Sequence, residues 1–458
     1  MPGPLKFVVR ERTRALDCRR DEVGLGLRLR KSSTVMPVDA TLEPATVPSA
    51  PPPRSRFGAL AYREYRLLWS GLVISNTGSW MQYLAQGWLV VELAANASQG
   101  ALYLGLVGLV RAVPVLLLSG VAGTLADRMD RRRILVVAQC VMGGSALVLG
   151  LLTQFGIVRI WEVMIVAAFS SAGAAFDAPT RQSLVPLIVH KRDLMNAIGL
   201  NSAAFNGPAI IGPALAGVLV ASIGVVPCFY INAASYVAVL VAVAMMSPKP
   251  PVEGVHRPGI WHEMLAGVRY MRGSTPLMGI MVLSTIVAIV ARPYIQLLPA
   301  FAKGVIGGGP GTLGILGSAA GAGALIGSII TAFIGLKRHR GRVLIGAALC
   351  AGLALVLFAS TRTELTASIA LILLGSTIML FMGMANTLLQ TYTRIDMRGR
   401  VMALYTMTFL GLMPLGTWVL GSVASVSSLP VAFTFAGAGI VVVALVWGYR
   451  AVELRALD

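Results

Sequence analysis

The sequence predicts an all-α membrane protein with twelve transmembrane helices in two six-helix halves. Hydrophobic residues make up 56% of the 458-residue chain, whereas charged residues make up only 12%. Soluble domains carry about 25% charged residues, so a surface exposed to water cannot be built from so few. Apolar runs of about 20 residues, the length that a helix needs to cross a bilayer, recur along the chain from Leu67 onward.

Twelve apolar runs can be read in order along the chain. Several exceed the length needed to cross a bilayer, so we expect tilted helices. The predicted spans are 67–91, 102–125, 134–154, 161–177, 197–221, 224–246, 277–301, 312–335, 343–360, 366–390, 401–424 and 430–449.

Lysine and arginine are distributed unevenly between these spans. Twenty-four of them fall in the last part of the N-terminal tail, in alternate gaps and after the last span, whereas the other gaps hold only Arg159, Lys303 and Arg362. Cytoplasmic loops of membrane proteins carry an excess of basic residues. The asymmetry therefore predicts that both termini are cytoplasmic, and it supports an even number of spans.

The longest gap between spans follows the sixth span and divides the chain six plus six. It contains SPKPPVEG and then WHEMLAGVRYMRG, a pattern that predicts a short amphipathic helix. Two related halves are an architecture of transporters. We expect a disordered tail at 1–56, rich in Pro, Ser and charges, then an N-terminal half at 57–247, a linker with a short helix at 248–276, a C-terminal half at 277–450 and a tail at 451–458.

Several function classes are excluded by what the chain lacks. The net charge of +19 is spread over short clusters between apolar runs, which argues against a nucleic-acid partner. The four cysteines and four histidines form no metal-ligand spacing, so we expect no metal and no cofactor. No phosphate-binding loop and no nucleophile with an adjacent base is apparent, so the chain is not expected to be an enzyme.

A loop motif follows the second span, in the segment GTLADRMDRRRIL. The segment resembles the loop signature of the major facilitator superfamily, G-x-L-A-D-R-x-G-R-R, with Asp130 where the family usually has glycine. A plain basic loop is the alternative, but it would not share this order of residues. The resemblance implies that the acidic residue pairs with arginines across helices and that this pair breaks as the halves rock. The gating motif then consists of Gly123, Asp127, Arg128, Arg131 and Arg132.

A second motif lies in the fifth span, FNGPAIIGPALAG. It resembles the antiporter signature of the same superfamily at Gly212, Pro213 and Gly217, whereas Ala216 replaces a glycine. Small residues let helices approach closely and proline kinks a span, so ordinary helix packing is the alternative interpretation. The resemblance implies export rather than uptake.

Longer segments are similar to one branch of the superfamily, the enterobactin-exporter-like or transmembrane secretion effector branch. They are residues 176–206, WLVVEL at 88–93 and PYIQLLPAFA at 293–302, and the resemblance extends over about residues 57–450. It implies the major facilitator fold and the export of siderophores, macrolides or other small molecules from bacteria.

Polar residues inside the spans mark a candidate substrate pathway, because lipid-facing positions exclude them. In the first span their spacing puts four of them on one helical face, and a further pair lies four residues apart in the tenth span. In the superfamily these two spans help to line the cavity, although hydrogen bonds between packed helices are an equal alternative. The residues are Ser75, Ser79, Gln82, Gln86, Asn386 and Gln390.

Two arginines and two carboxylates complete the candidate residues. Arg292 precedes Pro293 in the seventh span, and we expect it to face the cavity, where it could contact an anionic substrate. Arg111 lies in the second span and is also expected to face the interior or a water-filled cavity, with extension toward the outer interface as the alternative. No carboxylate lies in the middle of a predicted span, which leaves Glu92 and Asp127 as candidates for proton coupling.

Together these features predict a secondary active transporter that exports drug-like or siderophore-like small molecules across the bacterial cytoplasmic membrane. The predicted mechanism is alternating access coupled to the proton gradient, in a monomer embedded in the lipid bilayer. The alternatives are an uptake transporter and, less favoured, a membrane-embedded enzyme or a sensor.

Overall fold

The computed structural model describes residues 58–246, 260–334 and 339–450. Within these ranges only the backbone is described at residues 119–121, 123, 124, 126–128, 260–263, 334, 410 and 450. The predicted tails at 1–56 and 451–458 and much of the linker lie outside the described residues.

The described chain is helical throughout and has no strand. Short 3₁₀ turns lie at Gly58–Ala61 and Lys191–Asp193, and π-helical turns lie at Val287–Ala291, Ala302–Ile306 and Thr408–Leu412. The α-helices are α1 Arg63–Glu92, α2 Ala97–Arg128, α3 Arg131–Gln154, α4 Ile160–Ile188, α5 Leu194–Asn206, α6 Pro208–Ile223, α7 Val226–Ala244, α8 Ile260–Arg272, α9 Thr275–Ile286, α10 Tyr294–Phe301, α11 Pro310–Ile334, α12 Arg340–Ser360, α13 Glu364–Tyr392, α14 Ile395–Met407, α15 Met413–Val426 and α16 Leu429–Arg450.

Each predicted span corresponds to a helix or to a run of joined helices. In the part of the chain that the structure describes, ten helical stretches are long and apolar enough to cross a membrane, and Met413–Val426 is a shorter apolar helix. The remaining predicted span is α1, which is 30 residues long but carries many polar side chains. The all-helical membrane fold in two six-helix halves is thus confirmed, and the short amphipathic helix expected after the sixth span corresponds to α8.

Four predicted spans differ from the structure in their ends or continuity. Helix α4 continues to Ile188, although a span end was predicted at Asp177. The fifth span is divided at Gly207 into α5 and α6. The seventh and eleventh spans each contain π-helical turns, which hydropathy alone does not reveal because the apolar pattern continues through them.

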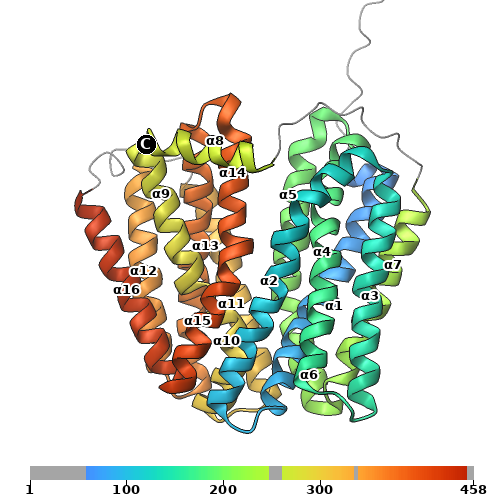
Figure 1. Ribbon diagram of the computed structural model, residues 1–458, viewed down its shortest axis with the longest axis vertical. Coiled ribbons are helices and arrows are strands. Elements are labelled where there is room, and N and C mark those ends of the chain that lie inside the picture. The colour runs from blue at the N-terminus through green and yellow to red at the C-terminus, as the bar shows by residue number, and fades with distance from the viewer. Residues whose placement is uncertain (1–57, 247–259, 335–338, 451–458) are drawn as a thin grey trace, which may run out of the picture. The chain divides into compact units, whose positions relative to one another are not determined.

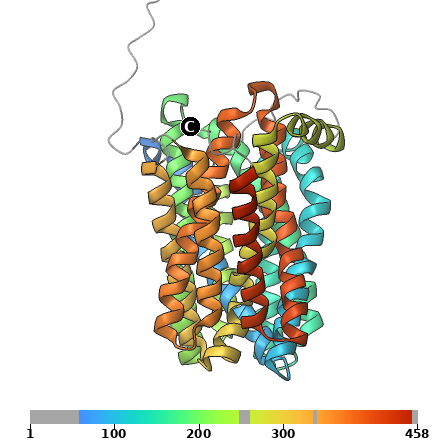
Figure 2. The ribbon, with the colours of Figure 1, turned by 90° about the vertical axis from the view of Figure 1, so that its left-hand side faces the viewer.

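The helices pack as two groups within residues 54–458 (Figures 1 and 2). In the first group, α3 packs on α4 and α7, and α1 packs on α6 and α7. In the second group, α13 packs on α11 and α12, and α12 also packs on α16. The most extensive contacts between the groups join α2 to α15 and α6 to α11. Helix α8 lies across one end of the second group, beside α14.

The two ends of the helices differ in charge. At the end that carries α8, the starts of α3, α5, α12 and α14 are rich in lysine and arginine, and we call this the basic end. The opposite end, which we call the outer end, has Arg159, Lys303 and Arg362. Arg181, counted in a loop from sequence, lies instead inside α4, so it does not belong to the loop asymmetry.

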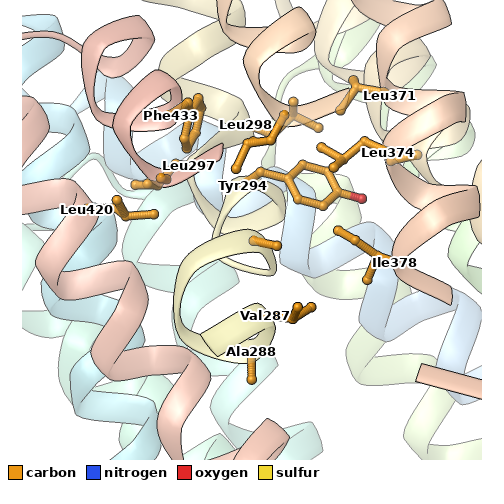
Figure 3. Close-up of a cluster of buried hydrophobic side chains, with 14 of the residues drawn as sticks. Val287, Ala288, Tyr294, Leu297, Leu298, Leu371, Leu374, Ile378, Leu420 and Phe433 are labelled. Carbon is orange, nitrogen blue, oxygen red and sulfur yellow. The ribbon is translucent and has the colours of Figure 1, made fainter. Parts of the chain in front are cut away.

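The second group is held together by a core of aromatic and aliphatic side chains (Figure 3). Tyr294 on α10 points toward Leu374 and Ile378 of α13. Phe301 stacks on Phe358 with ring centroids 4.2 Å apart. Burying one such aromatic ring removes roughly 150–250 Å² of surface from solvent, so this cluster anchors α10 between α12 and α13.

Candidate functional site

A polar cavity of about 320 Å³ lies within the first group of helices. Its lining comes from α1, α2, α3, α4, α5 and α7. Ser75, Ser79, Gln82 and Gln86, predicted from sequence to share one face of α1, all line it. Three of these side chains are less than 9% exposed, so their polar groups need partners inside the protein.

Partners for this face of α1 come mainly from α7. The Asn232 side-chain amide donates a hydrogen bond to Oε1 of Gln82 at 2.6 Å. The hydroxyls of Ser79 and Tyr236 are hydrogen bonded at 3.0 Å. Because these bonds satisfy buried polar groups, part of the predicted pathway face also packs α1 against α7.

An ion pair inside α4 forms the opposite wall of the cavity. Arg181 donates to both carboxylate oxygens of Asp177, at 2.6 and 2.5 Å. The side-chain amide of Gln139, on α3, donates to Oδ1 of Asp177 at 2.6 Å. The prediction that no carboxylate lies in the middle of a span was wrong here, because α4 continues to Ile188 beyond Asp177. The signal that could have found the pair is the four-residue spacing of Asp177 and Arg181, which places both on one helical face.

Arg111 on α2 turns into the protein rather than toward the outer interface. Its Nη2 donates a hydrogen bond to Oε1 of Gln86 at 2.5 Å. Its guanidinium also lies over the ring of Tyr83, 5.2 Å from the ring centroid. The amide nitrogen of Gln86 is buried without a hydrogen-bond partner. Arg111 lines the polar cavity and also a smaller one of about 30 Å³, which lies between the two groups.

Arg292 follows the π-helical turn Val287–Ala291 in the second group. The nearest polar contact of Arg292 is weak, a distance of 3.7 Å from Nη1 to the sulfur of Met382, and its buried Nε has no partner. Arg292 lines neither of the two cavities described above, so its expected place facing the substrate cavity stays a prediction.

The other two predicted pathway residues lie apart from this cavity. Asn386 accepts a hydrogen bond from the amide of Gln390 at 3.0 Å, and Gln390 is exposed. Neither residue lines the polar cavity in the first group. Their part in a pathway stays a prediction.

The gating motif lies where α2 ends and α3 begins. Arg131 is buried and donates to the hydroxyl of Ser183 on α4 at 2.9 Å. Arg132 donates to the carbonyls of Val243 and Ala244 at 3.1 Å, at the end of α7. Basic side chains satisfy and neutralise the free carbonyls at a helix end. These two arginines thus connect α3 to its neighbours. The side chains of Asp127 and Arg128, and the surroundings of Gly123, are outside what the structure describes.

Asp130, which departs from the superfamily pattern, has a structural role. Its Oδ1 accepts a hydrogen bond from the backbone N–H of Arg132 at 2.9 Å, so it caps the N-terminus of α3. A capping aspartate satisfies one of the free N–H groups of the first helical turn.

The antiporter-like motif lies where helices approach most closely. A Cβ added to Gly212 would stand 2.6 Å from Cβ of Trp80 on α1. A Cβ added to Gly217 would stand 2.6 Å from Cα of Gly314 on α11, and one added to Gly317 would stand 2.8 Å from Cβ of Pro213. The motif therefore lets α6 pack tightly on α1 within the first group and on α11 of the second group.

Glu92 lies away from the cavity, at the outer end of α1. Its side chain is exposed, and its Oε1 accepts a hydrogen bond from the indole N–H of Trp88 at 2.6 Å. As a candidate for proton coupling it has no contact with the cavity residues, whereas Asp177 lines the cavity directly.

Comparison with known proteins agrees with this architecture. A family model described as "Transmembrane secretion effector" matches residues 54–458. Macrolide efflux protein A of Streptococcus pyogenes is 21% identical over 357 residues, which cover 77% of this chain and 87% of the relative. Enterobactin exporter EntS of Salmonella typhimurium is 25% identical over 368 residues, which cover 80% and 84%.

Solved structures give the same fold. The crystal structure of the nucleoside transporter NupG superposes with a TM-score of 0.65, covering 85% of this chain and 98% of that one at 16% sequence identity. At this identity the likeness shows the fold alone.

Proposed function

Because the chain belongs to the transmembrane secretion effector family of the major facilitator superfamily, we propose that it exports small organic molecules across the bacterial cytoplasmic membrane by alternating access. The observation that carries this proposal is the polar cavity. The polar cavity lies inside an otherwise apolar helical protein. Three of its lining residues also line the small cavity between the two groups of helices: Tyr83, Gln86 and Arg111. A site at the interface of two repeats is where transporters of this kind bind their substrates.

The places where the two groups touch support an assignment of the state of the molecule. The close contacts of Gly217 with Gly314, and of Gly105 with Trp418, lie toward the outer end. Large apolar side chains near the basic end are exposed, among them Met195 at 77% and Ile395 at 85%. If the basic end is cytoplasmic, as the positive-inside rule suggests, the molecule is closed to the outside and open to the cytoplasm.

Energy would come from the proton gradient, with Asp177 as the carboxylate that couples transport to it. A proton on Asp177 would remove the charge that holds Arg181, and would weaken the hydrogen bond from Gln139. The side chains that bond to Asp177 come from α3 and from α4 itself. Protonation would thus weaken the contact between α3 and α4, which is the kind of local change that biases a two-state element.

Export is favoured over uptake by the relatives, since two of them are named for efflux or export. The test uses a strain deprived of its own exporters. Cells that express the chain should accumulate less of a macrolide, or of enterobactin, than cells that carry the uncoupled Asp177→Asn variant at the same membrane level. Higher accumulation in the expressing cells would favour uptake instead. If the two kinds of cell accumulate every compound equally, the proposal is contradicted.

A further inference from the structure

Arg111 and Arg292 are two permanent positive charges without a matching negative charge. Arginine stays protonated at every physiological pH, so neither can be neutralised by losing a proton. Among the residues that the structure describes, no carboxylate oxygen lies within 4.0 Å of either guanidinium. Asp127 is sixteen residues from Arg111 along one continuous helix, a rise of about 24 Å, so it cannot be the partner.

The other carboxylates near the helix interiors are already engaged. Asp177 is bonded to Arg181, and Glu92 lies at the outer end beside Trp88. Glu364, in the first turn of α13, accepts a hydrogen bond from Thr312. Away from the ends of the described spans, Arg111 and Arg292 are therefore left without a carboxylate partner. An intramembrane charge of this kind is costly, and it persists where it serves a ligand.

The two arginines come from different groups of helices but belong to neighbouring turns around one small cavity. Tyr83 lies under the guanidinium of Arg111 at 5.2 Å, and both line the cavity of about 30 Å³ together with Gln296, which follows Arg292 by one helical turn. Three buried polar atoms on these residues have no hydrogen-bond partner: Nε2 of Gln86, Oε1 of Gln296 and Nε of Arg292. Two of these three are donors, as an anion would require. Trp80 packs edge-on against Tyr83, with centroids 5.8 Å apart, and adds an apolar wall.

We propose that Arg111 and Arg292 together form the binding site for an organic anion, so that the substrate of this transporter carries a negative charge next to an apolar body. The assignment rests on the proposed transport function. The anion supplies the missing charge, and it draws one arginine from each group toward Tyr83. Because a ligand that contacts both groups binds best when they are close together, it favours the transition between the open states.

The first experiment measures binding rather than transport. The full chain is placed in nanodiscs of neutral lipid, and thermal unfolding is followed with 1-naphthoate, 1-naphthamide or 1-naphthylmethylamine at equal concentration. Naphthoate should raise the melting temperature more than the neutral amide, and the cationic amine should not raise it. The difference between naphthoate and amide should vanish in Arg111→Gln and in Arg292→Gln, and should survive in part in Arg111→Lys.

The melting temperatures of the two glutamine variants without ligand give a second test. They distinguish a ligand-binding arginine from one that only stabilises the fold. Removing an unpaired buried charge relieves a penalty, so Arg111→Gln and Arg292→Gln should melt at or above the temperature of the wild type without ligand. Arg159→Gln, which removes an exposed charge at the outer end, should leave both the melting temperature and the naphthoate effect unchanged. A lower melting temperature in both glutamine variants would overturn the proposal, since it would make the two arginines structural.

Two further comparisons are needed. One distinguishes a lipid headgroup from a substrate as the bound anion, and the other distinguishes failure of this site from failure of the proposed transport function. If nanodiscs with phosphatidylglycerol give the same arginine-dependent rise and abolish the naphthoate effect, a lipid headgroup occupies the site and the substrate assignment is overturned. Equal effects of naphthoate and naphthamide on the wild type would also overturn it, even if the chain exports a macrolide. If naphthoate binds but no compound is exported, the anion site is supported and the proposed transport function is contradicted.

Discussion

Gly217 on α6 and Gly314 on α11 approach so closely that a Cβ added to Gly217 would stand 2.6 Å from Cα of Gly314. Real Cβ atoms do not come this close to a backbone atom, so either helix must move if Gly217 gains a side chain. This contact joins the two groups at the outer end. It should exist in the state described here and be absent when the outer side opens.

Gly217→Ala should therefore shift the equilibrium toward the outward-open state. A penalty of about 1–3 kcal/mol on one state changes the population ratio roughly 5- to 150-fold. Spin labels at Ile223 and Leu365, both exposed near the outer end, should report a longer distance in the variant. Gly144→Ala is the matched control, because a Cβ there meets nothing within 4 Å. An unchanged distance distribution in Gly217→Ala would show that this contact does not distinguish the states.

Asp177→Asn should abolish coupling to the proton gradient while substrate exchange continues. The amide keeps the shape and the hydrogen bond with Gln139 but cannot titrate, and it leaves Arg181 without its charge partner. We expect export driven by an imposed pH gradient to fall at least tenfold, and exchange between equal substrate concentrations to persist. Proteoliposomes measure both. Glu92→Gln is the control, and full coupling in Asp177→Asn combined with its loss in Glu92→Gln would move the coupling role to Glu92.

Two aspartates between α2 and α3, Asp127 of the gating motif and Asp130 beside it, should behave in opposite ways. Asp130→Ala removes the cap of α3 and should lower stability by about 1 kcal/mol, with turnover per folded molecule unchanged. Asp127→Asn should keep stability but slow turnover, because the predicted pair that breaks and reforms during rocking would be lost. Thermal unfolding and transport at matched membrane levels separate the two. Normal turnover in Asp127→Asn would leave that residue no gating role.

The topology can be checked with reporter fusions. Fusions after residues 95, 250 and 308 should report outside, inside and outside, because basic residues concentrate at the end of the helices that carries α8. A periplasmic signal from the fusion at 250 would contradict both the orientation and the cytoplasmic termini.

Sequence alone was sufficient for the fold, because hydropathy and the distribution of basic residues depend on the membrane and not on packing. It also identified the polar face of α1, since Ser75, Ser79, Gln82 and Gln86 repeat with helical spacing and line one cavity. The α8 helix was found for the same reason, as its apolar and charged residues alternate with the helical period.

What sequence missed depends on context that lies far away along the chain. Pro179 made Asp177 look like the end of a span, whereas α4 runs through that proline, as membrane helices can when neighbours satisfy the freed backbone groups. The inward direction of Arg111 was the sequence prediction, but its partners, Gln86 and Tyr83, lie on another helix and could not be named from sequence. The position of Arg292 depends on the π-helical turn before it, which rotates the residues that follow.

The central claim, secondary export through the polar cavity, is tested most directly in everted membrane vesicles, in which export becomes movement into the lumen. On energisation, vesicles that contain the chain should accumulate a macrolide or enterobactin. They should lose it when a protonophore is added and should accumulate none when the chain carries Asp177→Asn. Accumulation equal to that of vesicles without the chain, or loss of a preloaded compound on energisation, would contradict the account.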